Sequence, residues 1–332
     1  MRLIDPTTVE AYCRDPATLA AALDVAPYVL LDLRDPQSAS PAADVVDGVG
    51  TLPCPVIALG PVAPAHAALA LACDAVADTP DAAASMIDGL LRSPMAATVL
   101  VQTLRAIESL PLASALVVES LAYASLQRGA EFQRWLATRP PPPSPVDEPG
   151  PAVEIERDGD RVQLHLNRPL QRNAMTLAMR DALVEALQWI RADDSVAVLS
   201  IDARGRCFST GGELSEFGTA PDPATAHWVR SLALPGRELA LCRHAATQAH
   251  VHGACIGSGI EFPAFAQTLS AHPDTHFQLP ELRFGLIPGA GGCVSISRRI
   301  GRQRTAAWVL SGKRIPARTA LAWGLIDRIT DA

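Results

Sequence analysis

The sequence lacks any hydrophobic run long enough to cross a membrane. The most apolar stretch of its 332 residues, from Leu110 to Leu126, is interrupted by Pro111 and Glu119, whereas a bilayer crossing needs about 20 apolar residues. The first fifteen residues carry acids where a secretory leader would be apolar. We therefore expect a cytoplasmic protein that does not associate with membranes.

Disulfide, metal and nucleic-acid signals are also missing. The seven cysteines are scattered and form no CxxC pair, which argues against a disulfide framework. The eight histidines show no metal-binding spacing such as HExxH, so we predict no metal site. The net charge is −7 and no basic run occurs, which excludes nucleic acid as an expected partner.

A proline-rich stretch divides the chain into two units. Residues 139–151 contain Pro140 to Pro143, Pro145, Pro149 and Pro151, and such a run favours extended linker geometry. The first unit, residues 1–138, is rich in alanine. Its patterns predict short strands at 29–33 and 55–59, then helices at 81–92, 94–109 and 111–138. We find no chemistry-bearing constellation there and expect this unit to be non-catalytic.

The second unit, residues 152–332, has the pattern of an α/β domain. Alternating strands are predicted at 153–156 and 161–166, with a hairpin signal at Asp158-Gly159. A helix should begin near Thr176, and a buried strand should follow at 196–201. The order strand, helix, strand implies a right-handed crossover and a parallel sheet.

Two glycine-rich turns and two glutamates of the second unit could build an active site. Gly211-Gly212 and Gly257-Ser258-Gly259 each follow a predicted strand, and glycine frees the backbone to direct an N–H at a ligand oxygen. Two such N–H groups can form an oxyanion hole. Glu261 lies just after the second turn among apolar residues, which should raise its pKa, and Glu281 follows Pro280. One such turn alone could be an ordinary tight turn, and one glutamate alone could be a surface or helix-capping residue.

Five segments in order resemble the enoyl-CoA hydratase/isomerase (crotonase) superfamily, over roughly residues 153–329. The matching segments begin at Asn167-Arg-Pro, Phe208-Ser-Thr-Gly-Gly-Glu-Leu, His252 through Glu261, Pro280-Glu281 through Gly292, and Ser311-Gly312-Lys313. They are similar to the family's LNRP, FSAGADL, HGxxxGGGxE, PExxLGLxPGxGG and closing TGxxIxAxEAxxxGLV motifs. Ser258 replaces the middle glycine of GGG, but its backbone N–H donor remains.

The resemblance implies an α/β fold, a crotonase (ClpP-like) spiral of ββα units in the C-terminal part. It places Glu261 and Glu281 at the catalytic positions and the N–H groups of Gly212 and Ser258 in the oxyanion hole. It implies substrate or coenzyme A contacts at further positions, namely Ala174, Gly211, Glu213, Leu214 and Gly257. Coenzyme A would enter as part of the substrate, with no covalently bound cofactor. The resemblance also implies that the protein forms a homo-oligomer, a trimer or a hexamer.

Retention of both glutamates favours hydration of a 2-enoyl-CoA, a lyase reaction. The same site would also suit an isomerase, a thioester hydrolase, a retro-aldol lyase or a non-catalytic CoA-binding partner. Within 214–240, Phe217, Trp228 and Leu232 either line an acyl pocket or simply pack.

The mainly helical first unit leaves two interpretations open. It is either a degenerate crotonase-like half whose helices cap the second unit, or an unrelated helical domain. The degenerate interpretation rests on segments after Leu52, Ala72 and Pro94 that resemble family motifs without the intervening GGGxE.

Overall fold

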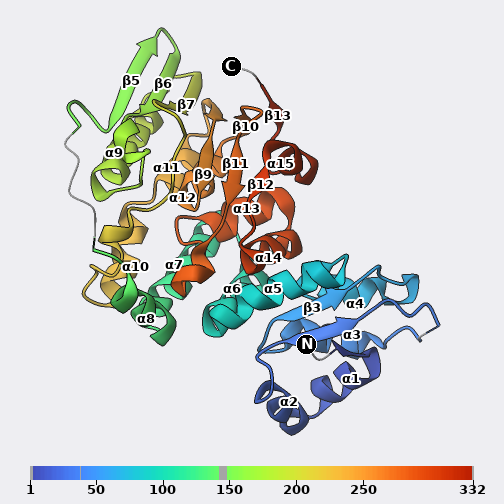
Figure 1. Ribbon diagram of the computed structural model, residues 1–332. Coiled ribbons are helices and arrows are strands. Elements are labelled where there is room, and N and C mark those ends of the chain that lie inside the picture. The colour runs from blue at the N-terminus through green and yellow to red at the C-terminus, as the bar shows by residue number, and fades with distance from the viewer. Residues whose placement is uncertain (1–2, 38, 142–147, 331–332) are drawn as a thin grey trace.

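The computed structural model describes residues 3–37, 39–141 and 148–330 as a mixed α/β protein (Figure 1). A four-stranded sheet lies at one end of the molecule. Two further sheets, of six and three strands, lie toward the other end. Most of the expected proline linker, residues 142–147, falls outside the described residues.

The N-terminal sheet is parallel throughout, in the order β1-β2-β3-β4. Its strands and flanking helices are β1 (Leu3–Ile4), α1 (Pro6–Arg14), α2 (Pro16–Leu23), β2 (Val29–Asp32), α3 (Ala43–Thr51), β3 (Val56–Leu59), α4 (Ala67–Ala72) and β4 (Ala75–Ala77). Strands β2 and β3 confirm the two predicted strands within one residue. Successive strand residues alternate between two cores: Leu31 and Val56 face α1 to α4, while Leu30 and Ile57 join a larger core.

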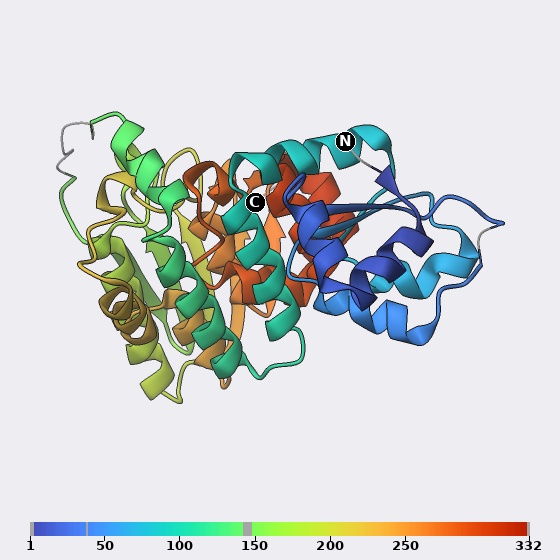
Figure 2. The same cartoon turned by 90° about the horizontal axis from the view of Figure 1, so that it is seen from below.

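Four helices follow this sheet along the chain, and the view from below shows the first three of them between the two ends of the molecule (Figure 2). They are α5 (Pro80–Arg92), α6 (Pro94–Ile107), α7 (Leu112–Leu126) and α8 (Ala130–Thr138). Thr79 caps α5 by accepting the Ala82 N–H at 3.2 Å. The prediction of one helix over 111–138 was wrong, because α7 ends at Leu126 and Gly129 is the N-cap of a separate helix, α8.

The six-stranded sheet has the order β13-β10-β8-β7-β6-β5 and is parallel except for the β5–β6 hairpin. Its strands are β5 (Val153–Asp158), β6 (Arg161–Leu166), β7 (Val198–Ala203), β8 (Ala246–Val251), β10 (Thr268–Ala271) and β13 (Arg328–Ile329). Thr176 caps α9 (Leu177–Ala192) as predicted. Strand β7 begins two residues later than expected, after a turn in which the Val196 N–H bonds to Asp193 O at 3.1 Å.

The three-stranded sheet and its surrounding helices complete the second part. The sheet has the order β12-β11-β9, made of β9 (Ala254–Ile256), β11 (His276–Gln278) and β12 (Ile315–Pro316). The helices are α10 (Pro223–Leu232), α11 (Pro235–Leu241), α12 (Ser258–Glu261), α13 (Gly292–Ile300), α14 (Arg302–Ser311) and α15 (Ala317–Trp323). Short 3₁₀ turns lie at Pro64–His66, Pro169–Gln171, Leu214–Glu216, Pro263–Phe265 and Glu281–Phe284.

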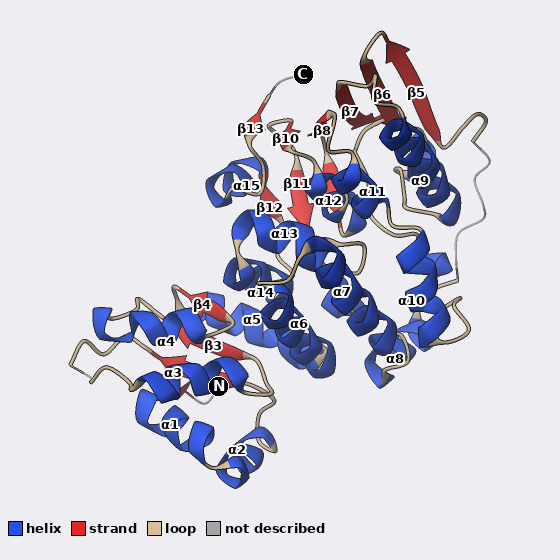
Figure 3. Ribbon diagram, turned by 180° about the vertical axis from the view of Figure 1, so that it is seen from behind, coloured by secondary structure: helices blue, strands red, loops and turns tan. Residues whose placement is uncertain are grey.

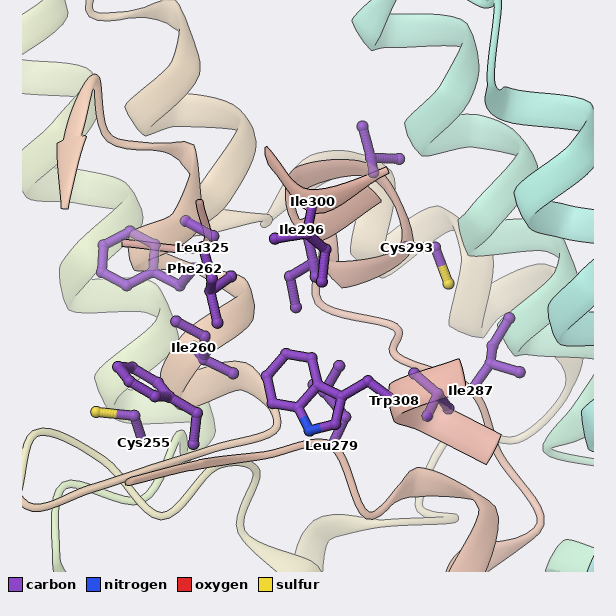
Figure 4. Close-up of a cluster of buried hydrophobic side chains, with 14 of the residues drawn as sticks. Cys255, Ile260, Phe262, Leu279, Ile287, Cys293, Ile296, Ile300, Trp308 and Leu325 are labelled. Atoms are coloured by element: carbon purple, nitrogen blue, oxygen red, sulfur yellow. The ribbon is translucent and has the colours of Figure 1, made fainter. Parts of the chain in front are cut away.

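One hydrophobic core links the two parts. It runs from Leu30 and Ile57 through α5, α6 and α7 to the residues around Trp308, which is 1% exposed. Figure 4 shows the centre of this core, where Trp308 lies among Ile260, Phe262 and Ile296. Large apolar side chains of this core therefore pack against the segments that carry the candidate site residues.

Helices α5, α6 and α7 of the first part pack directly on the second part, as Figure 3 shows for α6 and α7 beside α13 and α14. Gly89 of α5 allows a very close approach to α14, because a Cβ there would lie 1.8 Å from Leu310 O. The Ser93 hydroxyl donates to Leu282 O at 2.6 Å, and Arg302 pairs with Asp74 at 3.4 Å. Polar and apolar contacts thus hold the two parts together.

The described residues include no helix that is both long and apolar enough to span a bilayer. All seven cysteines are free thiols.

Candidate active site

The two glycine-rich turns predicted from the sequence lie side by side. The Ser209 N–H donates to Ala254 O and the Ile256 N–H donates to Ser209 O, each at 3.1 Å. Gly211 adopts a φ of 89°, and a Cβ there would lie 2.5 Å from Ile256 O. A Cβ at Gly259 would lie 2.4 Å from Ser209 O. The absence of side chains at these two positions lets the turns touch.

Two backbone amides remain free at this junction. Within the described part of the chain, no acceptor is recorded for the N–H of Gly212 or of Ser258. Both residues line the same cavity. The Ser258 hydroxyl is buried and also has no partner among the described residues. Two N–H groups that converge on one point can stabilise a developing oxyanion.

Asn173 stabilises the turn that contains Gly211 and Gly212 through hydrogen bonds. Its side chain is fully buried, accepts the Arg168 N–H at 2.8 Å and donates to Arg204 O at 2.9 Å. Its backbone carbonyl accepts the Ser209 hydroxyl at 2.7 Å. Asn173 adopts a φ of 51°, a left-handed conformation that asparagine tolerates better than most residues. These bonds fix the loop that leads into Gly211.

Glu261 ends the single turn of α12 and is 3% exposed. Its Oε2 accepts two backbone N–H groups, from Ala290 at 2.7 Å and from Gly292 at 2.9 Å. Burial raises the pKa of Glu261 to about 7, although these two N–H donors oppose the shift by favouring the charged form. The carboxyl group is therefore poised to exchange a proton near neutral pH.

Glu281 begins the 3₁₀ turn that follows β11, directly after Pro280, and is 8% exposed. Its Oε2 is buried and has no hydrogen-bond partner among the described residues. Burial, and then the nearby charge of Glu261, hold the pKa of Glu281 well above its usual value. A Cβ placed at Gly257 would lie 2.9 Å from Glu281 Oε1 and 3.9 Å from Glu261 Oε1. The two carboxylates thus converge beside the Gly257-Ser258 turn.

A cavity of about 540 Å³ joins these groups. Its lining includes every predicted site residue except Ala174, namely Gly211, Gly212, Glu213, Leu214, Gly257, Ser258, Glu261 and Glu281. Ala174 is buried outside the cavity, and its neighbours Met175 and Thr176 line it instead. Phe217 also lines the cavity, whereas Trp228 and Leu232 are 63% and 54% exposed and are not among its lining residues.

The first part contributes residues that the sequence analysis missed. Tyr123 of α7 and Gln127, the C-cap of that helix, line the cavity together with Arg230 of α10. Glu119, one turn before Tyr123, is 2% exposed and accepts the N–H groups of Gly291 at 2.7 Å and Val294 at 3.2 Å. It therefore holds the same turn that supplies the two donors to Glu261. Its only sequence signal is a charged residue inside an apolar helix.

Helix α8 covers another edge of the cavity. Its Trp135 lies 5.0 Å from Phe284 and 6.0 Å from Phe217, measured between ring centroids. Arg139, just after α8, donates to Leu214 O at 2.7 Å.

No group of three or more metal-ligating side chains occurs among the described residues.

Comparison with known proteins places this geometry in a family. The enoyl-CoA hydratase/isomerase family model matches residues 158–332, more than half of the chain. The chain is 31% identical to the 2,3-dehydroadipyl-CoA hydratase of Escherichia coli, over 53% of this chain and 68% of that protein. It is 29% identical to the mevalonyl-coenzyme A hydratase of Aspergillus fumigatus, over 51% of this chain and 62% of that protein.

The fold is also similar to solved structures. The enoyl-CoA hydratase from Thermoplasma volcanium matches with a TM-score of 0.51 and 30% identity, over 55% of this chain and 73% of that one. The residues matched by the family model, 158–332, include both glycine-rich turns and both glutamates. This chain belongs to the enoyl-CoA hydratase/isomerase family.

Proposed function

We propose that the protein hydrates 2-enoyl-CoA thioesters. The observation that carries the proposal is the convergence of two buried carboxyl groups, Glu261 and Glu281, beside two backbone N–H groups that bond to no acceptor among the described residues. Hydration needs an oxyanion site and groups that move two protons. The names of the relatives are consistent with this chemistry.

The thioester carbonyl of the substrate would accept the N–H groups of Gly212 and Ser258. These donors would stabilise the enolate-like charge that develops when water attacks the β-carbon. Both N–H groups come from turns in mutual contact, so the site needs little rearrangement to receive that charge.

We assign the two glutamates different roles because their surroundings differ. Glu261, with two N–H donors on Oε2, is the more easily ionised and takes a proton from the attacking water. Glu281, with no donor on its buried Oε2, is the better proton carrier and gives a proton to the α-carbon. One proton leaves water and one reaches carbon, so the net reaction adds H₂O across the double bond.

We further propose that the first unit, residues 1–138, is a degenerate crotonase-like half with no active site, and that its helices cap the second unit. Helix α7 and its C-cap supply Tyr123 and Gln127 to the cavity, and α8 packs on Phe217 and Phe284 through Trp135. The segments after Leu52 and Ala72 form neighbouring parallel strands without a glycine-rich turn and glutamate between them.

Hydration of a panel of enoyl-CoAs, followed by the loss of absorbance of the conjugated thioester, tests the proposal. Glu261→Gln and Glu281→Gln should each lower turnover by about 100- to 10,000-fold, the range typical of a lost general acid or base, while sparing CoA binding. Glu185→Gln changes an exposed residue of α9 in the same way and serves as the matched control.

Unchanged turnover in both cavity variants would reject the roles given to the glutamates. Loss of conjugation without uptake of water, so that the product keeps the mass of the substrate, would instead indicate an isomerase. Release of free CoA would indicate a thioester hydrolase.

A further inference from the structure

A cation from α10 lies inside the active-site cavity. Arg230 is half-buried and lines the cavity with Tyr123 and Gln127. Its guanidinium carbon lies 4.0 Å from the centroid of the Tyr123 ring, a close cation–π arrangement. The side chain is thus held in place by an aromatic face rather than by a counter-ion.

No carboxylate of the described residues lies within ion-pair distance of this guanidinium. Arg230 Nη1 donates to Ala226 O at 3.1 Å and to Gln127 Oε1 at a long 3.5 Å. Every acceptor in this set is neutral. Arginine offers five N–H donors in a rigid fork that matches a carboxylate in both charge and geometry. The cavity therefore contains a positive charge that forms no ion pair with a described carboxylate, although its charge reaches Glu261 and lowers the pKa of that group.

The position of Arg230 follows from the residues around Tyr123. The Tyr123 ring packs against Gly289, where a Cβ would lie 2.0 Å from the ring. Gly289 precedes Ala290, whose N–H binds Glu261. Arg230 consequently lies on the side of the cavity formed by Glu261 and the turn after Pro288. Gly212 packs instead against Phe217.

The proposed chemistry orients the substrate across these two sides. The carbonyl oxygen sits at the N–H groups of Gly212 and Ser258, and the α- and β-carbons sit beside the glutamates. In this orientation, an acyl chain that extends past Glu261 would reach Tyr123 and Arg230, which line the same cavity.

We infer that Arg230 binds a carboxylate at the far end of the acyl group, so that the substrates are CoA thioesters of unsaturated dicarboxylic acids. This inference rests on the proposed function for the orientation of the acyl group. The Tyr123 hydroxyl lies in the same part of the cavity and is a second possible donor for the carboxylate.

The test compares two saturated ligands, hexanoyl-CoA and adipyl-CoA, which differ only in a terminal methyl against a terminal carboxylate. Calorimetric titration of the full chain should give tighter binding of adipyl-CoA. Arg230→Met should weaken adipyl-CoA binding by about 10- to 100-fold, as expected for a lost hydrogen bond to a charged group. Hexanoyl-CoA binding should change by less than about threefold in the same variant.

Two further variants keep the experiment interpretable. Arg230→Lys retains the charge without the fork and should keep part of the preference for adipyl-CoA. Trp228→Ala removes an exposed side chain from the same helix and should leave both affinities unchanged.

Equal affinity of the unaltered protein for the two ligands would overturn the inference, and so would equal weakening of both ligands in Arg230→Met. Neither ligand has a double bond, so binding does not depend on turnover. A protein that prefers adipyl-CoA but hydrates nothing would refute the hydratase proposal alone.

Discussion

At the scale of single residues, the two glutamates differ in what surrounds them. Both are buried and close to Gly257, yet Glu261 receives two backbone N–H groups and Glu281 Oε2 receives none. Hydrogen bonds to the charged form offset part of the cost of burial. The pKa of Glu261 is accordingly raised only to about 7, whereas that of Glu281 lies well above its usual value.

This difference predicts a bell-shaped dependence of kcat/KM on pH. Activity should rise with pH through about 7, because Glu261 must lose its proton to act as the base. It should fall again at higher pH, because Glu281 must keep its proton to act as the acid. Initial rates of enoyl-CoA hydration between pH 5 and 10 measure this profile. A rate that decreases steadily from pH 5 upward would contradict the assignment of Glu261 as the base.

Glycine-rich turns and acidic residues were recognisable in the sequence because their chemistry is local. Gly211, Gly257 and Glu261 lie within short motifs that need no knowledge of the fold. Arg230 and Tyr123 could not be predicted in the same way, because they come from helices α10 and α7, which meet only in the folded protein. Ala174 was placed in the site by motif position, but its side chain is buried outside the cavity.

At the scale of elements, helix α7 binds the turn around Gly291 through one buried carboxyl group. Glu119 accepts N–H groups of Gly291 and Val294, which lie 172 and 175 residues further along the chain. Burial, and then the charge of Glu261, raise the pKa of Glu119 from 4.5 to about 8, against the effect of the N–H donors. No pattern within α7 reveals these partners, so a sequence reading sees only an acid in an apolar helix.

The raised pKa of Glu119 predicts a pH-dependent contribution to stability. Folded Glu119 keeps its proton up to about pH 8, whereas the unfolded chain releases it near pH 4.5. The stabilisation is therefore full below about pH 4.5 and is lost as pH rises through 8. Glu119→Gln cannot titrate, so its free energy of unfolding should fall less steeply between pH 5 and 8.

Urea unfolding at several pH values within that range measures the two slopes. The exposed Glu185→Gln variant should keep the slope of the unaltered protein. Parallel curves for Glu119→Gln and the unaltered protein would show that Glu119 titrates alike in both states.

Other elements were predictable to the extent that their signals are local. Strands β5 and β6 follow from alternation, and the start of α9 near Thr176 follows from helical spacing of apolar residues. The break between α7 and α8 was missed because Gln127 to Gly129 offers a single glycine within a helical pattern. A lone glycine is tolerated in many helices and is a weak boundary signal.

At the scale of the whole molecule, one core extends from the N-terminal sheet to the active site. Leu30, Leu104 and Trp308 belong to the same buried cluster, although they come from distant parts of the sequence. The sequence suggested two units, and the structure joins them through α5 to α7. Contacts between segments so far apart depend on the tertiary fold, which periodicity within a segment does not encode.

The central claim is that one thioester oxygen is held by two backbone amides beside the two glutamates. A crystal structure of the full chain with a saturated acyl-CoA bound tests it most directly. The account predicts the thioester oxygen about 2.7–3.1 Å from the nitrogens of both Gly212 and Ser258, with the carboxyl groups of Glu261 and Glu281 facing the α- and β-carbons. A thioester bound elsewhere, with either amide left without the oxygen, would contradict the account.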